Sequence, residues 1–498
     1  MSSEKKQLII NAFAMQSPSH LNPGLFRNPG DKGAEYKNLK TWIALAQKLE
    51  AAKFHAIFFA DVLGGYDPAL NSPINDPLYS IPAMAAATES IGFGVTASTT
   101  YDAPYALARR FSTVDHLSNG RVGWNIVTSY LDSAARNFGL DTQIEHDERY
   151  RIADEYLDVT YKLWEASWRD DAVTWRQEDA GPDGAKEGQT YANPRAVRQI
   201  NHKGKYFQVP GPHLCEPSPQ RTPFILQAGT SAAGKAFAAR HAEAVFLHAQ
   251  KPELVRPSVD SIRQQAKGFG RNPQDIKIVA GALVIVAETD EEAHAKFNHL
   301  KKYGDREGAL ALFGGWTGYD LSKYTDDQDF RFVELPAVRS MKWDKKTIAD
   351  YLTLGGNGVK IIGSVQTVAD ELERWVTVGD VDGFNLSYAT VPDTFDDIIT
   401  LLLPSYGNEA CSGRIMLSQE ARSGRTSTAN GATPGFLRIT PERSIPGKQE
   451  KKSPGTRWRS PMHRRYERTM TRIVTYGLVS RWINMNDRRK GGIRMNVS

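Results

Sequence analysis

Short apolar runs alternate with amphipathic stretches through the first 404 of the 498 residues. This alternation is typical of βα units joined into a parallel sheet. It predicts an α/β fold of the (β/α)₈ TIM barrel type, with an open doubly wound Rossmann sheet as the alternative. No G-x-G-x-x-G motif follows the first strand, which weighs against the Rossmann sheet. The eight expected strands cover residues 7–15, 55–61, 92–99, 121–129, 223–229, 243–249, 277–287 and 383–389.

Helix signals lie between these strands. Asp102 is placed to cap a helix that has Pro104 in its first turn. A second helix is expected from Ser364 to Gly379, a glycine suited to the position after a helix.

Two segments are longer than such a barrel requires. Residues 166–222 follow the fourth strand and include the hairpin-like HKGKYFQVPG, and residues 304–345 follow the seventh strand. Long insertions at the carboxyl ends of barrel strands commonly shape a substrate pocket.

Four neighbouring strands finish in polar residues. The second ends in Asp61, the third in Ser98 and two threonines, the fourth in Asn125 and VTS, and the fifth in QAGTS. The carboxyl ends of barrel strands form the catalytic face, so polar residues there have a functional reason. Taken singly, each is explained more simply as a helix cap or a partner for loop backbone.

The stretch ILQAGTSAAGKAFAAR leads from the fifth strand through Gly229, Thr230 and Ser231 directly into a helix. The first amides and the positive dipole end of that helix would face an anion such as phosphate. His146 and Tyr150 lie four residues apart, on one side of another helix. A structural contact between these two rings is an equally good explanation.

Motifs of several other chemistries are absent from the sequence, including H-E-x-x-H, paired C-x-x-C, the P-loop and G-x-S-x-G. His241 and His248 bracket one strand and do not obviously converge, so no metal site is expected. Cys215 and Cys411 are too few for a disulfide scaffold. Without a secretory signal or an apolar run long enough to cross a bilayer, the expected location is cytoplasmic. Metal-free cofactor chemistry is the leading hypothesis.

Three stretches are similar to a known family: LARRFSTVDHLSNGRVGWNIVTS (107–129), NFGLD (137–141) and HDERYRIADEYLDVTYKLWEAS (146–167). They resemble nitrilotriacetate monooxygenase component A and its relatives among the bacterial luciferase-like flavin monooxygenases, which include dibenzothiophene-sulfone and dimethyl-sulfide monooxygenases. FFADVLGGY (58–66) and QAGTSAAGKAFAARHAEAVF (227–246) fit the same pattern, so the likeness covers about residues 8–404.

The resemblance implies a two-component oxidoreductase that uses FMN. A separate NAD(P)H-dependent flavin reductase, a transient partner, would supply FMNH₂. A flavin C4a-(hydro)peroxide would then insert one atom of O₂ into a small organic substrate, an amine, sulfide or sulfone. A homo-oligomer is expected, with neither membrane nor nucleic acid as a partner.

The resemblance also assigns polar residues to the two ends of FMN. Asp61 and Ser98 correspond to the isoalloxazine end, with Asn125 near the ring. The ribityl-phosphate end takes His146, Tyr150 and Ser231, beside which Thr230 lies. Because flavin supplies the oxygen chemistry, the protein has to position the ring, hold the phosphate and exclude water.

The segment MQSPSHLNPGLFRNP (15–29) aligns with a family stretch that commonly reads His…Gly-x-Trp-Arg-x-Pro. His20 matches the histidine, whereas Phe26 stands where Trp is usual and Asn28 where His is usual. His20 is therefore the expected catalytic residue, hydrogen-bonding the peroxide or orienting the substrate, with loop packing as the alternative.

Two other functions stay open at this point. One is a deazaflavin-dependent oxidoreductase of the same superfamily, although the matched motifs belong to the FMN branch. The other is a non-catalytic flavin-binding protein, which would bind oxidised FMN tightly and form no oxygen-dependent product.

The resemblance stops at Pro404, where the composition changes. Residues 405–498 contain 19 Lys and Arg and 6 Asp and Glu, a net charge of +13, whereas residues 1–404 carry −8. We expect a luciferase-like barrel domain at 1–404 and a basic, disordered tail at 405–498. If codons are chosen freely for residues 405–431 and read two nucleotides downstream, they can encode LWERGLFWKDYAVPGGTLRENLYGKW. This is the ending expected of the family. We hypothesise a frameshift or misplaced splice junction; a genuine basic extension is the alternative.

Overall fold

The computed structural model describes residues 7–66, 73–175, 190–319, 321–328 and 344–406. The chain divides into the units Met1–Ala429 and Asn430–Ser498. The second unit, and all but the first two residues of the expected tail, lie outside the described residues. The domain limits and the frameshift therefore stay hypotheses.

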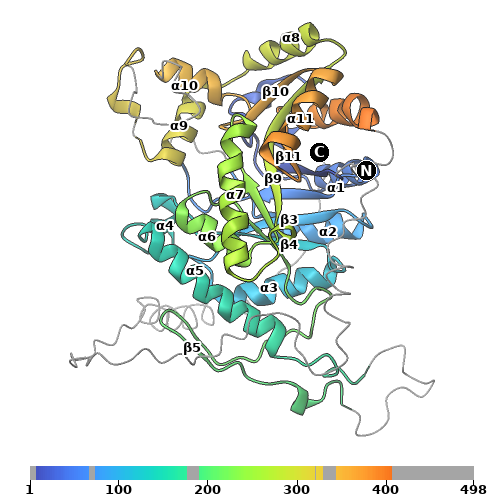
Figure 1. Cartoon of the computed structure of the whole chain (residues 1–498), viewed down its shortest axis with the longest axis vertical. Helices are drawn as coiled ribbons and strands as arrows, with labels where there is room; N and C mark the ends of the chain where they lie inside the picture. Colours follow the sequence, from blue (N-terminus) through green and yellow to red (C-terminus); the bar gives the residue numbers. More distant parts are fainter. Residues whose placement is uncertain (1–6, 67–72, 176–189, 320, 329–343, 407–498) are drawn as a thin grey trace, which may run out of the picture. The chain divides into compact units, whose positions relative to one another are not determined.

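Eight parallel strands close into a barrel, which confirms the predicted fold class (Figure 1). Each strand pairs with the next in chain order, β8 pairs with β9, β9 with β11, and β11 returns to β1. All eight predicted strands are present within a few residues of their expected bounds. They are β1 (Ile9–Met15), β2 (Ala56–Ala60), β3 (Gly92–Ser98), β4 (Val122–Val127), β7 (Phe224–Gln227), β8 (Ala244–Leu247), β9 (Lys277–Ala287) and β11 (Gly383–Ser387).

Aromatic rings fill the barrel interior. The Phe13 ring centroid lies 5.5 Å from that of Phe58 and 4.9 Å from that of Phe246. β1 and β8 are not neighbours in the sheet, so their rings meet across the interior. On β3, a Cβ added to Gly94 would lie 3.3 Å from the Phe58 ring, so this position also faces inward. Because side chains alternate along a strand, Thr96 faces inward as well, nearer the carboxyl ends.

Helices cover the outside of the strands (Figure 1). Their apolar faces include Leu49, Leu107 and Trp375, all fully buried against the barrel. The helices are α1 (Leu39–Ala51), α2 (Ile81–Ala86), α3 (Pro104–Leu117), α4 (Asp132–Asn137), α5 (His146–Tyr161), α6 (Ala232–His241), α7 (Pro252–Gly268), α8 (Asp290–Lys301), α9 (Arg306–Thr317), α10 (Lys345–Leu352), α11 (Val365–Gly379) and α12 (Asp393–Asp397).

Two helix-end predictions were wrong in detail. Asp102 does not cap α3; the cap residue is Ala103, and the Asp102 carboxylate lies 2.6 Å from the guanidinium of Arg110 instead. Gly379 is the last residue of α11, and the left-handed position after the helix belongs to Asp380, with φ +54°. The carboxylate of Asp380 forms an ion pair with Arg263, a long-range contact that holds it there.

The two predicted insertions are present. The first contains a small hairpin, β5 (His202–Lys203) and β6 (Gln208–Val209), where one was expected. The second contains α9, which shares a small apolar core around Phe313 with α10, a helix that begins where the predicted insertion ends. A further strand that was not predicted, β10 (Val359–Ser364), pairs with the far half of β9. Among the described helices, none combines the length and apolar character that a membrane crossing requires.

Candidate active site

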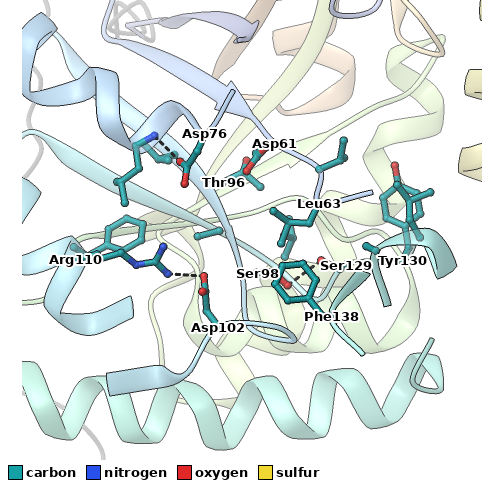
Figure 2. A pocket seen from close by; sticks show the side chains of 18 residues that line it. Asp61, Leu63, Asp76, Thr96, Ser98, Asp102, Arg110, Ser129, Tyr130 and Phe138 are labelled. Atoms are coloured by element: carbon teal, nitrogen blue, oxygen red, sulfur yellow. Dashed lines mark hydrogen bonds and ion pairs between the residues drawn. The ribbon is translucent and has the colours of Figure 1, made fainter. Parts of the chain in front are cut away.

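A cavity of about 260 Å³ opens at the ends of β2, β3 and β4, and Asp61 and Ser98 both line it (Figure 2). The Ser98 and Ser129 hydroxyls are 2.8 Å apart. Ser129 follows β4 with φ +56°, a conformation that costs a non-glycine residue energy and is concentrated at functional sites. Most other lining groups are apolar, such as Leu63 and Phe138.

Charged groups also face this cavity. Burial and the nearby negative charge of Asp76 raise the pKa of Asp61 to about 7. Asp102 and Arg110 line the cavity as an ion pair (Figure 2). Asp61 is therefore a carboxyl group that exchanges a proton near neutral pH beside an apolar space.

A second group of predicted residues meets where α5 and α6 begin. Ser231 caps α6, its hydroxyl accepting the Gly234 N–H at 3.0 Å. The Tyr150 hydroxyl lies beside Gly229 and Gly234, where it interacts with the side chains of Ser231 and Thr128, and burial raises its pKa. Since Thr128 precedes Ser129, polar groups run continuously along the rim from the cavity to the start of α6.

Two glycines make this arrangement possible. A Cβ added to Gly229 would lie 2.5 Å from the Tyr150 hydroxyl and 2.3 Å from Nε2 of Gln227. A Cβ added to Gly234 would lie 2.8 Å from the same hydroxyl. A larger side chain at either glycine would displace Tyr150. The backbone at Gly229 and Gly234 therefore encloses the Tyr150 hydroxyl closely, and we call this arrangement the cradle.

His146 and Thr230 lie at the exposed margin of this group. His146 is the first residue of α5, and its ring packs edge-on against Tyr150 at 5.3 Å between centroids. Its Nδ1 lies 2.7 Å from the Asp147 carboxylate. Thr230 is exposed in the loop before α6. The structural contact weighed for His146 is therefore present, and its role at the phosphate end of the flavin stays a prediction.

Asn125 lies inside the barrel and presents an unused acceptor. Its Nδ2 donates to Thr96 Oγ1 at 2.8 Å, and Thr96 donates to the Phe59 carbonyl at 2.8 Å. This chain of donors fixes the amide orientation. The Oδ1 of Asn125 is buried without a partner, as is Oε1 of Gln227 at the end of β7.

His20 lies in the loop after β1 and is 5% exposed. Its ring packs edge-on against that of Phe13, with 4.4 Å between the centroids. His20 therefore lies directly on the aromatic rings that fill the barrel interior. Its Nδ1 is buried without a partner. Burial, and then the neighbouring His248, lower the pKa of His20 to about 3. His20 is thus a neutral acceptor above the barrel core.

The model of the family described as luciferase-like monooxygenase matches residues 24–381. The chain belongs to this family. It is therefore a flavin-dependent monooxygenase, and the resemblance found in the sequence is confirmed.

Similarity to individual luciferase-like monooxygenases covers most of each chain. The dimethyl-sulfide monooxygenase of Hyphomicrobium sulfonivorans is 46% identical, covering 80% of this chain and 86% of its own length. The crystal structure of that organism's enzyme superposes with a TM-score of 0.75 at 44% identity, covering 80% of this chain and 88% of the other. The long-chain alkane monooxygenase of Geobacillus thermodenitrificans is 47% identical, covering 80% and 89%. Nitrilotriacetate monooxygenase component A of Aminobacter aminovorans is 30% identical, covering 78% and 89%.

The residues present fit the FMN that this family uses. The buried acceptors of Asn125, Gln227 and His20 lack donors, and a flavin ring carries N–H donors. The cradle at Tyr150 and the start of α6 supplies a hydroxyl, backbone amides and a positive helix end for a phosphate. Within the described residues, no three His, Cys, Asp or Glu side chains gather as metal ligands would.

Sequence reasoning missed several groups of this site. Thr128 and Ser129 were visible as polar strand ends but were not assigned to the flavin. His248 was considered as a metal ligand alone, and Gln227 carried no signal apart from its place at a strand end. Thr96 could have been found by its two-residue spacing from Ser98 on the same strand.

Proposed function

We propose that this chain is the oxygenase of a two-component, FMNH₂-dependent system that inserts one atom of O₂ into a small organic substrate. The row of polar groups from Asp61 to Ser231 supports the proposal, because it leads from a cavity to a helix start that is suited to an anion. A separate NAD(P)H-dependent flavin reductase would deliver the reduced flavin. When bound, reduced FMN supplies the electrons that activate O₂.

The chain's own residues would divide the work of binding. Tyr150 and Ser231 would hold the phosphate, with His146 and Thr230 at its outer side. Asp61, Ser98 and Asn125 would contact the ring. His20 would present an acceptor to a substrate or flavin donor, and the apolar cavity walls would keep water away.

The substrate is proposed by class. The relatives' names include a sulfide, an alkane and an aminopolycarboxylate, so the shared barrel does not determine the substrate. We propose a small amine, sulfide or sulfone as the substrate class. The homo-oligomeric state and cytoplasmic location stay predictions.

The experiment combines the purified chain with FMN, NADH and a flavin reductase under ¹⁸O₂. Mass spectrometry would follow ¹⁸O in products of candidate amines, sulfides and sulfones, and a peroxidase assay would measure free hydrogen peroxide. We expect one ¹⁸O atom per product molecule and little peroxide with the true substrate class. Peroxide alone with every substrate, together with tight binding of oxidised FMN, would favour a non-catalytic flavin-binding protein.

A further inference from the structure

The buried side chain of Asn22 connects the loop that carries His20 to two distant parts of the chain. Asn22 is 1% exposed and lies two residues after His20. Its Nδ2 donates to the carbonyl of Tyr388, the residue that follows β11. Its Oδ1 accepts the N–H of Gly355, which lies between α10 and β10, at 2.8 Å. One amide group therefore bridges the His20 loop, the end of a barrel strand and the turn after α10.

The helical pair α9–α10 is also bonded to the same loop at both of its ends. Before α9, the Asp305 N–H donates to the Pro23 carbonyl at 2.8 Å. After α10, the Gly356 N–H donates to the Leu21 carbonyl at 3.1 Å. Because α9 and α10 share an apolar core, the loop holds the helical pair as one packed body.

Two glycines after α10 let the backbone come this close to the loop. Gly355 and Gly356 have φ +73° and +55°, the left-handed conformation that favours glycine. A Cβ added to Gly356 would lie 3.0 Å from the Trp316 ring on α9 and 3.2 Å from the Leu21 side chain. The turn after α10 therefore lies directly between α9 and the His20 loop.

The position of the His20 ring depends on the same contacts. Tyr388, whose carbonyl accepts from Asn22, has its ring 6.1 Å from that of His20 between centroids. The His20 ring also packs against that of Phe13. Since Nδ1 of His20 has no hydrogen-bond partner, the ring is located by this packing and by the loop that carries it.

Asparagine provides both groups that this junction needs. Its amide donates through Nδ2 and accepts through Oδ1 at the same time. A leucine has a similar size but offers neither group, so Asn22→Leu would leave the Tyr388 carbonyl and the Gly355 N–H unpaired inside the protein.

We propose that Asn22 is a positioning residue that couples the place of the His20 ring to the seating of the helical pair α9–α10. With both hydrogen bonds of its amide made, the loop is held between the turn after α10 and the end of β11. The consequence for catalysis is that loss of this coupling admits water and releases hydrogen peroxide, and it rests on the proposed function. The place of the His20 ring does not, because it is a property of the chain without any ligand.

The test follows the His20 ring by NMR in the ligand-free chain with ¹³Cε1-labelled histidine, and His20→Gln assigns its resonance. Because the ring packs against Phe13, its Cε1–H resonance is shifted by the aromatic ring current. We expect Asn22→Ala and Asn22→Leu to move this resonance toward that of an exposed histidine. Asn28→Ala is the matched control, because Asn28 belongs to the same loop but its amide donates to the adjacent Pro29 carbonyl at 3.2 Å.

A second pair of variants approaches the junction from the side of α10. Gly355→Ala places a Cβ 2.9 Å from the Leu283 side chain and should move the same His20 resonance. Gly318→Ala is its control, because Gly318 also has a left-handed backbone, φ +75°, but a Cβ there has no neighbour within 4 Å. Amide hydrogen exchange in α9 should be about 10-fold faster in Asn22→Leu and unchanged in Asn28→Ala.

Three results would overturn the inference. The first is an unmoved His20 resonance in the folded Asn22 and Gly355 variants, and the second is an equal shift in both controls. The third is faster exchange in the loop with α9 unchanged. With the true substrate, the ratio of product to hydrogen peroxide should fall in Asn22→Leu and not in Asn28→Ala. A moved resonance in a chain that forms no product would refute the proposed function alone, whereas an unmoved resonance in an active monooxygenase would refute the role of Asn22 alone.

Discussion

Gly229→Ala tests the phosphate cradle directly. The new Cβ would lie 2.5 Å from the Tyr150 hydroxyl and 2.3 Å from Gln227 Nε2. The tyrosine hydroxyl would have to retreat by about 1 Å to reach ordinary van der Waals separation. It would then move away from Ser231, from Thr128 and from the start of α6, where the phosphate is expected.

The lost contact between the Tyr150 hydroxyl and the phosphate sets the magnitude. A hydrogen bond to a charged group contributes about 1.5–3 kcal/mol, or roughly 10- to 150-fold in the affinity for FMNH₂. Anaerobic titration with photoreduced FMN, followed by flavin fluorescence, measures the Kd. Gly268→Ala is the control, because a Cβ there has no neighbour within 4 Å and belongs to α7. Equal FMNH₂ affinity in Gly229→Ala and the wild type would refute the reasoning.

Two further predictions concern pH and the second insertion. In the folded chain the pKa of Asp61 lies near 7, above its ordinary value of 3.8. Between these two pH values the folded chain holds a proton on Asp61 that the unfolded chain has lost, so the free energy of unfolding falls as the pH rises from 3.8 to 7. Tm measured from pH 5 to pH 8 should therefore decline less in Asp61→Asn than in the wild type, and parallel curves would contradict this. Tyr66→Phe removes a hydroxyl that lies 2.7 Å from the Tyr130 hydroxyl and accepts Trp316 Nε1–H at 3.3 Å. Tyr66→Phe should lower the free energy of unfolding by about 1 kcal/mol and speed amide hydrogen exchange in α9. Tyr191→Phe is the control and should leave exchange in α9 unchanged. Equal exchange in both variants would show that the Tyr66 hydroxyl does not hold α9 in place.

The fold was predictable because the apolar runs and the intervening amphipathic stretches are local signals. β10 was not predicted for a local reason as well. It is short, it contains Lys360, and its last residue, Ser364, is the cap of α11. The helix-end predictions were wrong because both acidic residues form ion pairs with residues beyond the local sequence. Asp102 pairs with Arg110 and Asp380 with Arg263. Such pairs cannot be found from neighbouring residues.

The site was predictable in its strand positions but not in its contacts. The polar strand ends gave Asp61 and Ser98, and the barrel brings both to one cavity. The hydroxyl of Ser129 reaches Ser98 through a left-handed backbone that no sequence pattern indicates. The rings of His20 and His248 both lie near the Phe13 ring, an arrangement that depends on how β1 and β8 face each other across the barrel.

The most direct test of the account is a crystal structure of the chain with FMN. We predict phosphate oxygens within hydrogen-bonding distance of the Tyr150 hydroxyl and the first amides of α6, with the ring at the barrel mouth beside Asp61 and Ser98. FMN bound away from this rim, or with its phosphate at the Asp61 end, would contradict it.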